Sequence, residues 1–280
     1  MQLRAMVFSL PIMALMLAPA DESGGCGKEE TDNSTEIKAL AEDAGEANGA
    51  ADATNALASI PALNLKTAAT VATAATAAQT AGTNMGVWFK PAGCIKAIQS
   101  GALVTYTFSG CTGPLGLVGI NGKLEATFSI TTDGVRISVK SVGLKIGNTA
   151  VTQTGGAEVT FSGTTRTLKW SGSYKGKTAK GGLDLSHSAS YTVEYDTATS
   201  CVKVPDGSGT TYVGTRGVDT ITSGYERCGT VWKCPKSGTI TATAKTSGLS
   251  ISIKYLGNGK ASLTGPGGKT YEYKMLWCML

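Results

Sequence analysis

Histidine is almost missing from this sequence: among 280 residues only His187 carries an imidazole. A Ser-His-Asp triad needs that one residue beside an activated serine, and the sequence contains no G-x-S-x-G elbow. The H-E-x-x-H metal motif, the P-loop and the dinucleotide fingerprint are absent as well. These absences exclude the common motif-bearing enzyme classes, and the sequence predicts neither a cofactor nor a metal site.

Long hydrophobic runs are also missing after residue 26, since none approaches the ~18 residues that a membrane-spanning helix needs. Aromatic residues make up only 6% of the chain, whereas glycine is abundant at 37 residues. This composition favours short strands joined by tight turns. A pair of carboxylates for glycoside hydrolysis remains an alternative, although nothing in the spacing singles out a pair among Asp184, Glu194, Asp196 and Asp219.

Residues 1–26 have the pattern of an export signal: Arg4, an apolar run over 5–17 and an exit of small residues. Two processing routes stay open. Either Cys26 is lipidated and becomes the mature N-terminus, or cleavage follows the A-x-A site that ends at Ala20. Lipidation of Cys26 leaves an even number, six, of the seven cysteines for pairing, whereas Ser23 replaces the leucine usual in lipoproteins.

Charge divides the rest of the chain at about residue 86. Residues 27–86 carry three Lys and eight Asp/Glu, whereas residues 87–280 carry 21 Lys/Arg and ten Asp/Glu. The acidic segment is rich in Ala and Thr, and its periodicity predicts a helix over about 35–58 and a helix or flexible linker over about 65–82. We expect this arm to tether the basic domain that follows, or to fold back on it.

From residue 87 the apolar period becomes two, as in Val104, Tyr106 and Phe108. About a dozen strands without intervening helices predict an all-β domain, either an antiparallel β-sandwich or a curled β-meander. The apolar phase slips near Lys140 and Ser141, which predicts a β-bulge there. Glycine-containing turns are expected at Asp206-Gly207, Ser247-Gly248 and Asn258-Gly259.

Six cysteines in an exported β domain most often form three disulfides. Proximity favours Cys94–Cys111. For the remainder, Cys201–Cys228 with Cys234–Cys278 competes with Cys228–Cys234 and Cys201–Cys278. The spacing of Cys228 and Cys234 is wider than in structural zinc sites, and no second such pair exists.

His187 shares the apolar phase of its segment with Leu185 and Ala189, so we expect it in the core. The basic domain should attract anionic partners such as anionic lipid or acidic polysaccharide. Its candidate anion-binding residues are the crowded Lys175, Lys177 and Lys180. Nucleic acid is not an expected partner, because the lysines are not interleaved with stacking aromatic residues.

The exit at Cys26 and two cysteine-framed segments together resemble bacterial envelope lipoproteins with an all-β body. The segments are Phe108-Ser109-Gly110-Cys111-Thr112-Gly113-Pro114 and Cys234-Pro235-Lys236-Ser237-Gly238. The resemblance implies a lipid-anchored location in the cell envelope, as an outer-membrane lipoprotein or in the periplasm, with secretion as the alternative. We therefore expect a non-enzymatic binding or envelope-structural role; a tethered polysaccharide hydrolase and a periplasmic lipid or ligand carrier are the alternatives.

Overall fold

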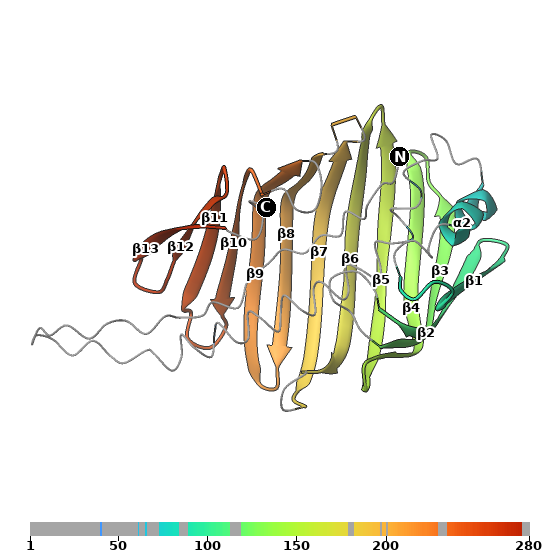
Figure 1. Cartoon of the computed structure of the whole chain (residues 1–280), viewed down its shortest axis with the longest axis horizontal. Helices are drawn as coiled ribbons and strands as arrows, with labels where there is room; N and C mark the ends of the chain where they lie inside the picture. The colour runs from blue at the N-terminus through green and yellow to red at the C-terminus, as the bar shows by residue number, and fades with distance from the viewer. Residues whose placement is uncertain are drawn as a thin grey trace, which may run out of the picture.

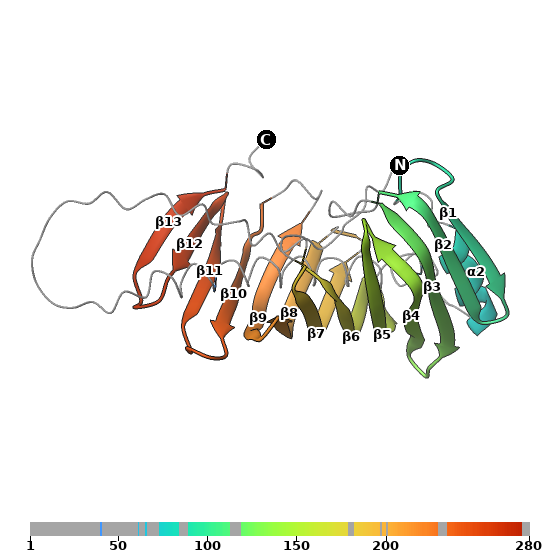
Figure 2. The same cartoon turned by 90° about the horizontal axis from the view of Figure 1, so that it is seen from below.

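A computed structural model describes the chain at residues 40, 61, 65, 73–83, 89–112, 119–178, 182–196, 198–199, 201–228 and 234–275. Thirteen strands form one antiparallel sheet in which each strand pairs with its neighbours in the sequence (Figure 1). The all-β prediction is confirmed, and the architecture is the meander. Seen from below, the sheet curves into an open trough whose ends, β1 and β13, stand apart (Figure 2).

The first half of the sheet runs through β1 (Ile95–Ser100), β2 (Leu103–Cys111), β3 (Ile120–Ile130), β4 (Gly134–Ile146), β5 (Thr149–Ser162) and β6 (Thr165–Lys177). The second half comprises β7 (Asp184–Asp196), β8 (Cys201–Val213), β9 (Arg216–Cys228), β10 (Ser237–Ala244), β11 (Ser250–Gly257), β12 (Lys260–Thr264) and β13 (Thr270–Lys274).

One face of the sheet is buried and the other is exposed, which is the arrangement that alternating side chains produce. On β2, Val104, Tyr106 and Phe108 are buried, and the residues between them are not. Leu185, Ala189 and Tyr191 do the same on β7. We call these sides the buried face and the exposed face.

The predicted bulge on β4 is confirmed. The register against β5 shifts between Lys140 and Leu144, and Gly143 in this interval has a φ of 58°. Glycine adopts that left-handed conformation without the steric cost that a Cβ imposes. The shift moves Leu144 back to the buried face, so the slip in the sequence reflects an extra residue in the strand.

The predicted turn at Asp206-Gly207 is wrong, because both residues lie inside β8. Gly207 pairs with Tyr191 of β7, and the tyrosine ring lies against the Gly207 backbone so closely that a Cβ would collide with it. Trp170 covers Gly172 similarly: its Cζ2 lies 2.7 Å from where a Cβ would be. The rings of Trp170 and Tyr191 stack with centroids 6.0 Å apart. The glycines in these strands therefore make room for aromatic rings. An Asp-Gly pair in a sequence would more often indicate a turn.

Helix α2 (Ala74–Thr83) packs against β1, β2 and β3 through Ala77, Ala78 and Ala81. Thr73 caps it by accepting a hydrogen bond of 3.1 Å from the Thr76 N–H. This helix falls in the region predicted as helix or linker over 65–82. The other predicted helix, over 35–58, lies outside the described residues except for Leu40, which is helical and buried.

The disulfide Cys94–Cys111 joins the start of β1 to the end of β2, as proximity favours. Beside it, the rings of Phe89 and Phe108 meet edge to face with centroids 5.2 Å apart. Closing a loop of this size stabilises a fold by about 3 kcal/mol in the chain-entropy estimate. The first hairpin is thus held by a covalent bond and an aromatic contact.

Candidate functional site

Small hydroxyl side chains occupy the centre of the exposed face. Ser171, Ser190 and Ser208 lie directly opposite one another on β6, β7 and β8. Neighbouring strands are ~4.8 Å apart, so these hydroxyls repeat at that spacing across the sheet. Larger side chains stand on one side of this row, at Lys169, Thr192 and Asp206, and further small hydroxyl residues stand on the other, at Ser173, Ser188 and Thr210.

Two adjoining depressions follow, with volumes of about 420 and 590 Å³. Ser171 and Ser190 line both of them, and we call the combined feature the polar groove. The first depression is lined mainly by Arg136, Ser138, Glu158, Lys169, Thr192 and Asp206. The second is lined mainly by Ser188, Ser208, Thr210, Asp219, Thr220 and Ile221.

Charges of both signs line the first depression in balance. Arg136 pairs with Glu158 across β4 and β5 at 3.4 Å. Lys169 lies between Glu158 and Thr192 in the register, and the Thr192 hydroxyl donates a 3.3 Å hydrogen bond to Asp206. Two cations thus face two carboxylates, an arrangement that offers hydrogen-bond donors and acceptors without a strong local field.

Asp219 organises the second depression. Its carboxylate accepts a 2.6 Å hydrogen bond from the Thr210 hydroxyl and bonds of 2.7 and 2.9 Å from the Lys245 ammonium group. The Lys245 and Thr210 hydrogen bonds lower the pKa of Asp219, and Asp219 in turn raises the pKa of Lys245. Both groups stay charged at neutral pH, so Asp219 is a fixed acceptor.

Three of the carboxylates named as hydrolase candidates, Asp184, Asp196 and Asp219, have a lowered pKa. The pKa of Asp184 is lowered by its hydrogen bond to Lys177, and that of Asp196 by the Ala198 N–H and the Thr199 hydroxyl. A general acid at neutral pH needs a raised pKa. Together with Asp219, these groups suit hydrogen bonding and charge pairing better than proton donation.

Two of the three candidate anion-binding lysines, Lys175 and Lys177, lie two residues apart on the same face of β6. Lys175 is exposed on β6. Lys177 is engaged, because its ammonium group pairs with Asp184 at 2.8 Å and donates to the Gly182 carbonyl at 3.2 Å. Lys180 lies outside the described residues.

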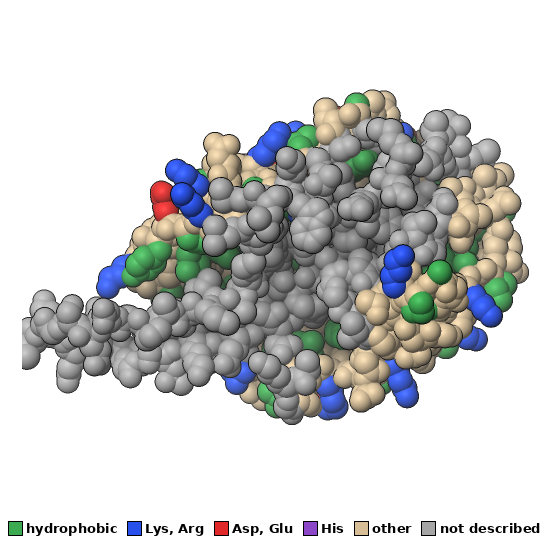
Figure 3. Space-filling view, viewed as in Figure 1, with side chains coloured by type: hydrophobic (Ala, Val, Ile, Leu, Met, Phe, Trp, Pro, Cys, Tyr) green, Lys and Arg blue, Asp and Glu red, His purple; other side chains and the backbone are tan. Residues whose placement is uncertain are grey.

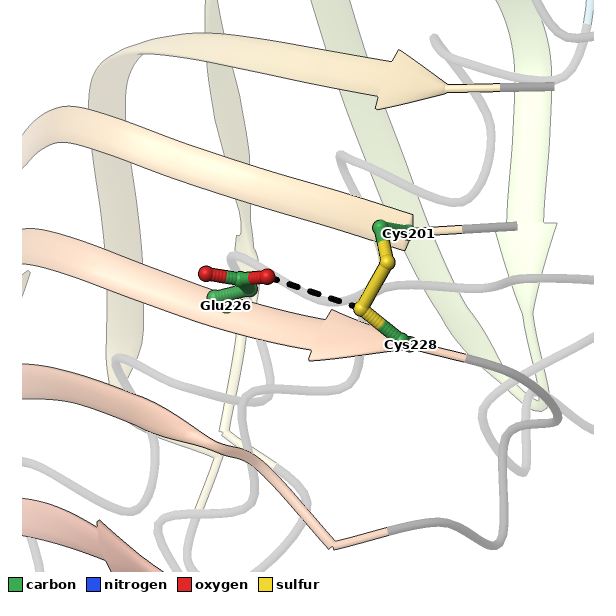
Figure 4. Close-up of side chains that lie close together, drawn as sticks. All are labelled: Cys201, Glu226 and Cys228. Carbon is green, nitrogen blue, oxygen red and sulfur yellow. Dashed lines mark hydrogen bonds between the residues drawn. A yellow bond between two sulfur atoms is a disulfide. The ribbon is translucent and has the colours of Figure 1, made fainter. Parts of the chain in front are cut away.

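Cys201 and Cys228 form a disulfide between directly opposed residues of β8 and β9 (Figure 4). The rival pairing that joins Cys228 to Cys234 is therefore wrong. Cys234 is also disulfide-bonded, and its partner lies outside the described residues. Glu226 Oε1 lies 3.5 Å from Cys228 Sγ, which makes these three residues a geometric candidate for a metal. The two sulfur atoms are bonded to each other, so neither is the thiolate that a metal needs.

His187 is buried on β7, as expected, with 2% of its surface exposed. Its Nδ1 and the Thr211 hydroxyl of β8 form a 2.7 Å hydrogen bond. Burial lowers the pKa of His187 to about 4, so the imidazole is neutral at physiological pH. Nε2 has no hydrogen-bond partner among the residues that the structure describes.

Sequence reasoning missed the polar groove. The signal was present in Ser186, Ser188 and Ser190, which alternate with the apolar residues of β7, and in Ser171 and Ser173 on β6. What was missing was the register that places these serines side by side. Within the described part of the chain, no helix is both long and apolar enough to cross a bilayer.

No family model, curated protein or solved structure matches this chain. The two disulfides indicate folding in an oxidising, extracytoplasmic compartment.

Proposed function

We propose that this chain is an exported, non-enzymatic binding protein of the cell envelope that holds a hydroxyl-rich polysaccharide in the polar groove. The observation that carries the proposal is the groove itself: two adjoining depressions with a floor of hydroxyls and walls of paired charges. Sugar hydroxyls both donate and accept hydrogen bonds. Ser190, Asp206 and Arg136 all line the first depression and offer the complementary groups.

The charge of the domain supports a partner in the envelope. In the described residues from 89 to 275 there are 19 Lys and Arg and ten Asp and Glu. Five of these carboxylates take part in ion pairs, so much of the positive charge has no acidic neighbour. An excess of this size raises the encounter rate with acidic polymers through long-range attraction. The balanced groove would then provide short-range recognition.

The N-terminal anchor is part of the same proposal. A lipid on Cys26 would keep the domain at a membrane surface, and the acidic arm would give it reach. Multiple acyl chains anchor stably because each buried methylene contributes about 0.8 kcal/mol. Cleavage after Ala20 would instead release the domain with the same groove.

Affinity electrophoresis tests the groove. The protein is run through gels that contain polygalacturonate, dextran or solubilised peptidoglycan, and we expect retardation by at least one polymer. Ser190→Trp places an indole in the region shared by both depressions and should weaken retardation by tenfold or more. Thr127→Trp is the matched control, because Thr127 is exposed on β3 and lines neither depression.

Two results would overturn the proposal. One is the absence of retardation by every polymer, and the other is an equal effect of Ser190→Trp and Thr127→Trp. Thermal unfolding followed by circular dichroism shows whether both variants keep the fold. Both positions are exposed on strands, so each substitution should change the stability only slightly.

A second candidate, a carrier of small amphiphiles, is favoured by the buried face. Trp170 Nε1, His187 Nε2 and the hydroxyls of Tyr225 and Tyr255 are buried without a hydrogen-bond partner in the described ranges. Each such group costs roughly 1–3 kcal/mol unless something satisfies it. A carrier would show extra mass in native mass spectrometry after detergent-free purification. Trp170→Phe should lower the occupancy if the indole N–H holds the ligand.

A further inference from the structure

The C-terminal end of the sheet exposes aromatic side chains on the face that is buried on the inner strands. Tyr271 and Tyr273 of β13 lie opposite Leu263 and Ala261 of β12, so they continue the buried face to the last strand of the sheet. At that edge they are 62% and 39% exposed. Tyrosine is favoured where one end of a side chain meets an apolar medium and the other meets water.

Lysines lie along the same edge of the sheet, and Lys260 and Lys274 project from the exposed face, opposite to the two tyrosines. Lys254, Lys260, Lys269 and Lys274 are all exposed, and the only acidic residue between 250 and 275 is Glu272. None of the four lysines has an ion pair among the described residues. Hydrophobic and basic side chains lie side by side at the β11–β13 end in the space-filling view (Figure 3).

One lysine pair places two like charges opposite each other, with Glu272 two residues away on the same face of β13. Lys260 and Lys274 are directly opposed in the register of β12 and β13. Like charges at opposed positions of a sheet destabilise it. On β3 and β4, by contrast, Lys140 meets a carboxylate, because Glu125 lies opposite it at 3.1 Å. An external anion bound between Lys260 and Lys274 would remove the repulsion.

We propose that the β12–β13 edge docks on an anionic lipid surface, with Lys260 and Lys274 at the lipid phosphates and Tyr271 and Tyr273 at the headgroup boundary. Tyrosine is enriched at that boundary, and lysine is attracted to anionic leaflets. The combination favours a membrane over a soluble acidic polymer, because a polymer offers no apolar layer for the tyrosines. This surface is separate from the polar groove and does not depend on the proposed polysaccharide.

Vesicle flotation tests the inference with the full chain carrying Cys26→Ser, so that no acyl anchor contributes. Vesicles of phosphatidylcholine with 30% phosphatidylglycerol are compared with pure phosphatidylcholine vesicles in 50 mM salt. We expect at least tenfold tighter binding to the anionic vesicles, lost at 500 mM salt. Each lysine near an anionic surface strengthens binding by about fivefold, so Lys260→Gln with Lys274→Gln should weaken it about 25-fold.

The matched control is Lys123→Gln with Lys145→Gln, which removes the same charge from exposed positions of β3 and β4. It should change binding by less than twofold. Equal losses in the two double variants would show attraction by net charge alone and would overturn the proposal. Equal binding to both vesicle types would overturn it as well.

Tyr271→Ser probes the aromatic part and should weaken vesicle binding several-fold, with no change in retardation by polygalacturonate gels. A loss of gel retardation without a loss of vesicle binding would point instead to a polymer site and would refute docking on lipid. The glutamine variants remove a repulsion, so they should be at least as stable as the unmodified chain. A folding defect therefore cannot imitate the expected result.

Discussion

Because the chain has a single histidine, its stability at mildly acidic pH tests the burial of one side chain. Burial lowers the pKa of His187 to about 4, against 6.5 for an exposed imidazole. Between these values the unfolded chain binds a proton that the folded chain does not. Stability is therefore complete above pH 6.5 and falls as the pH drops towards 4.

The size of the loss follows from the two pKa values. At 1.36 kcal/mol per pH unit, the full separation corresponds to about 3 kcal/mol, of which about 2 kcal/mol is lost by pH 5. The residues opposite His187 on β6 and β8 are Tyr174 and Thr211, and neither carries a charge in this range. The carboxylates with lowered pKa values titrate in a more acidic window.

Urea unfolding at pH 7.5 and pH 5.0 measures the effect. The unmodified chain should lose about 2 kcal/mol between these conditions, and His187→Gln should lose much less. Thr211→Val removes the hydrogen-bond partner of Nδ1 and keeps the imidazole, so its pH-dependent loss should persist. The single histidine also gives one Hε1 resonance, which should not move above pH 5. Titration of that resonance near 6.5, or an equal loss in His187→Gln, would refute the burial argument.

Three further predictions concern the glycines, a disulfide and the anchor. Gly207→Ala should lower the free energy of unfolding in urea by about 1–3 kcal/mol, because its Cβ collides with the Tyr191 ring. The loss should vanish in a Tyr191→Ala background and should be small for Gly156→Ala. A loss that persists without the Tyr191 ring would contradict the mechanism. Replacing Cys94 and Cys111 together by serine should lower the free energy of unfolding by about 3 kcal/mol. Under reducing conditions, the double variant and the unmodified chain should have the same free energy of unfolding. Labelled fatty acid should follow the protein in producing cells and disappear with Cys26→Ala; label that persists in this variant would exclude Cys26 as the lipid site.

The sequence predicts the fold where local alternation carries the information. Val104, Tyr106 and Phe108 alternate with threonines, and β2 buries those three residues. The turns at Ser247-Gly248 and Asn258-Gly259 lie between successive strands, as expected. The phase slip at Lys140 likewise became a bulge. In each case the neighbours that decide the structure are adjacent in the chain.

Prediction failed where a distant residue decides. Asp206-Gly207 has the composition of a turn, yet Tyr191 on the preceding strand needs the space above Gly207 and keeps the segment extended. The ion pair of Lys177 with Asp184 likewise forms only because the β6–β7 hairpin brings the two side chains together. The polar groove requires the register of β4 to β9, which no single segment encodes.

The strand order has a consequence for how such a sheet can change. Since every strand pairs only with its predecessor and its successor, removing or adding one hairpin leaves all other pairings as they were. The molecule is in this respect a linear array, whose cohesion is a sum of nearest-neighbour terms. Its length along the array is therefore free to evolve in steps of two strands, and forced or thermal opening should proceed inward from the ends.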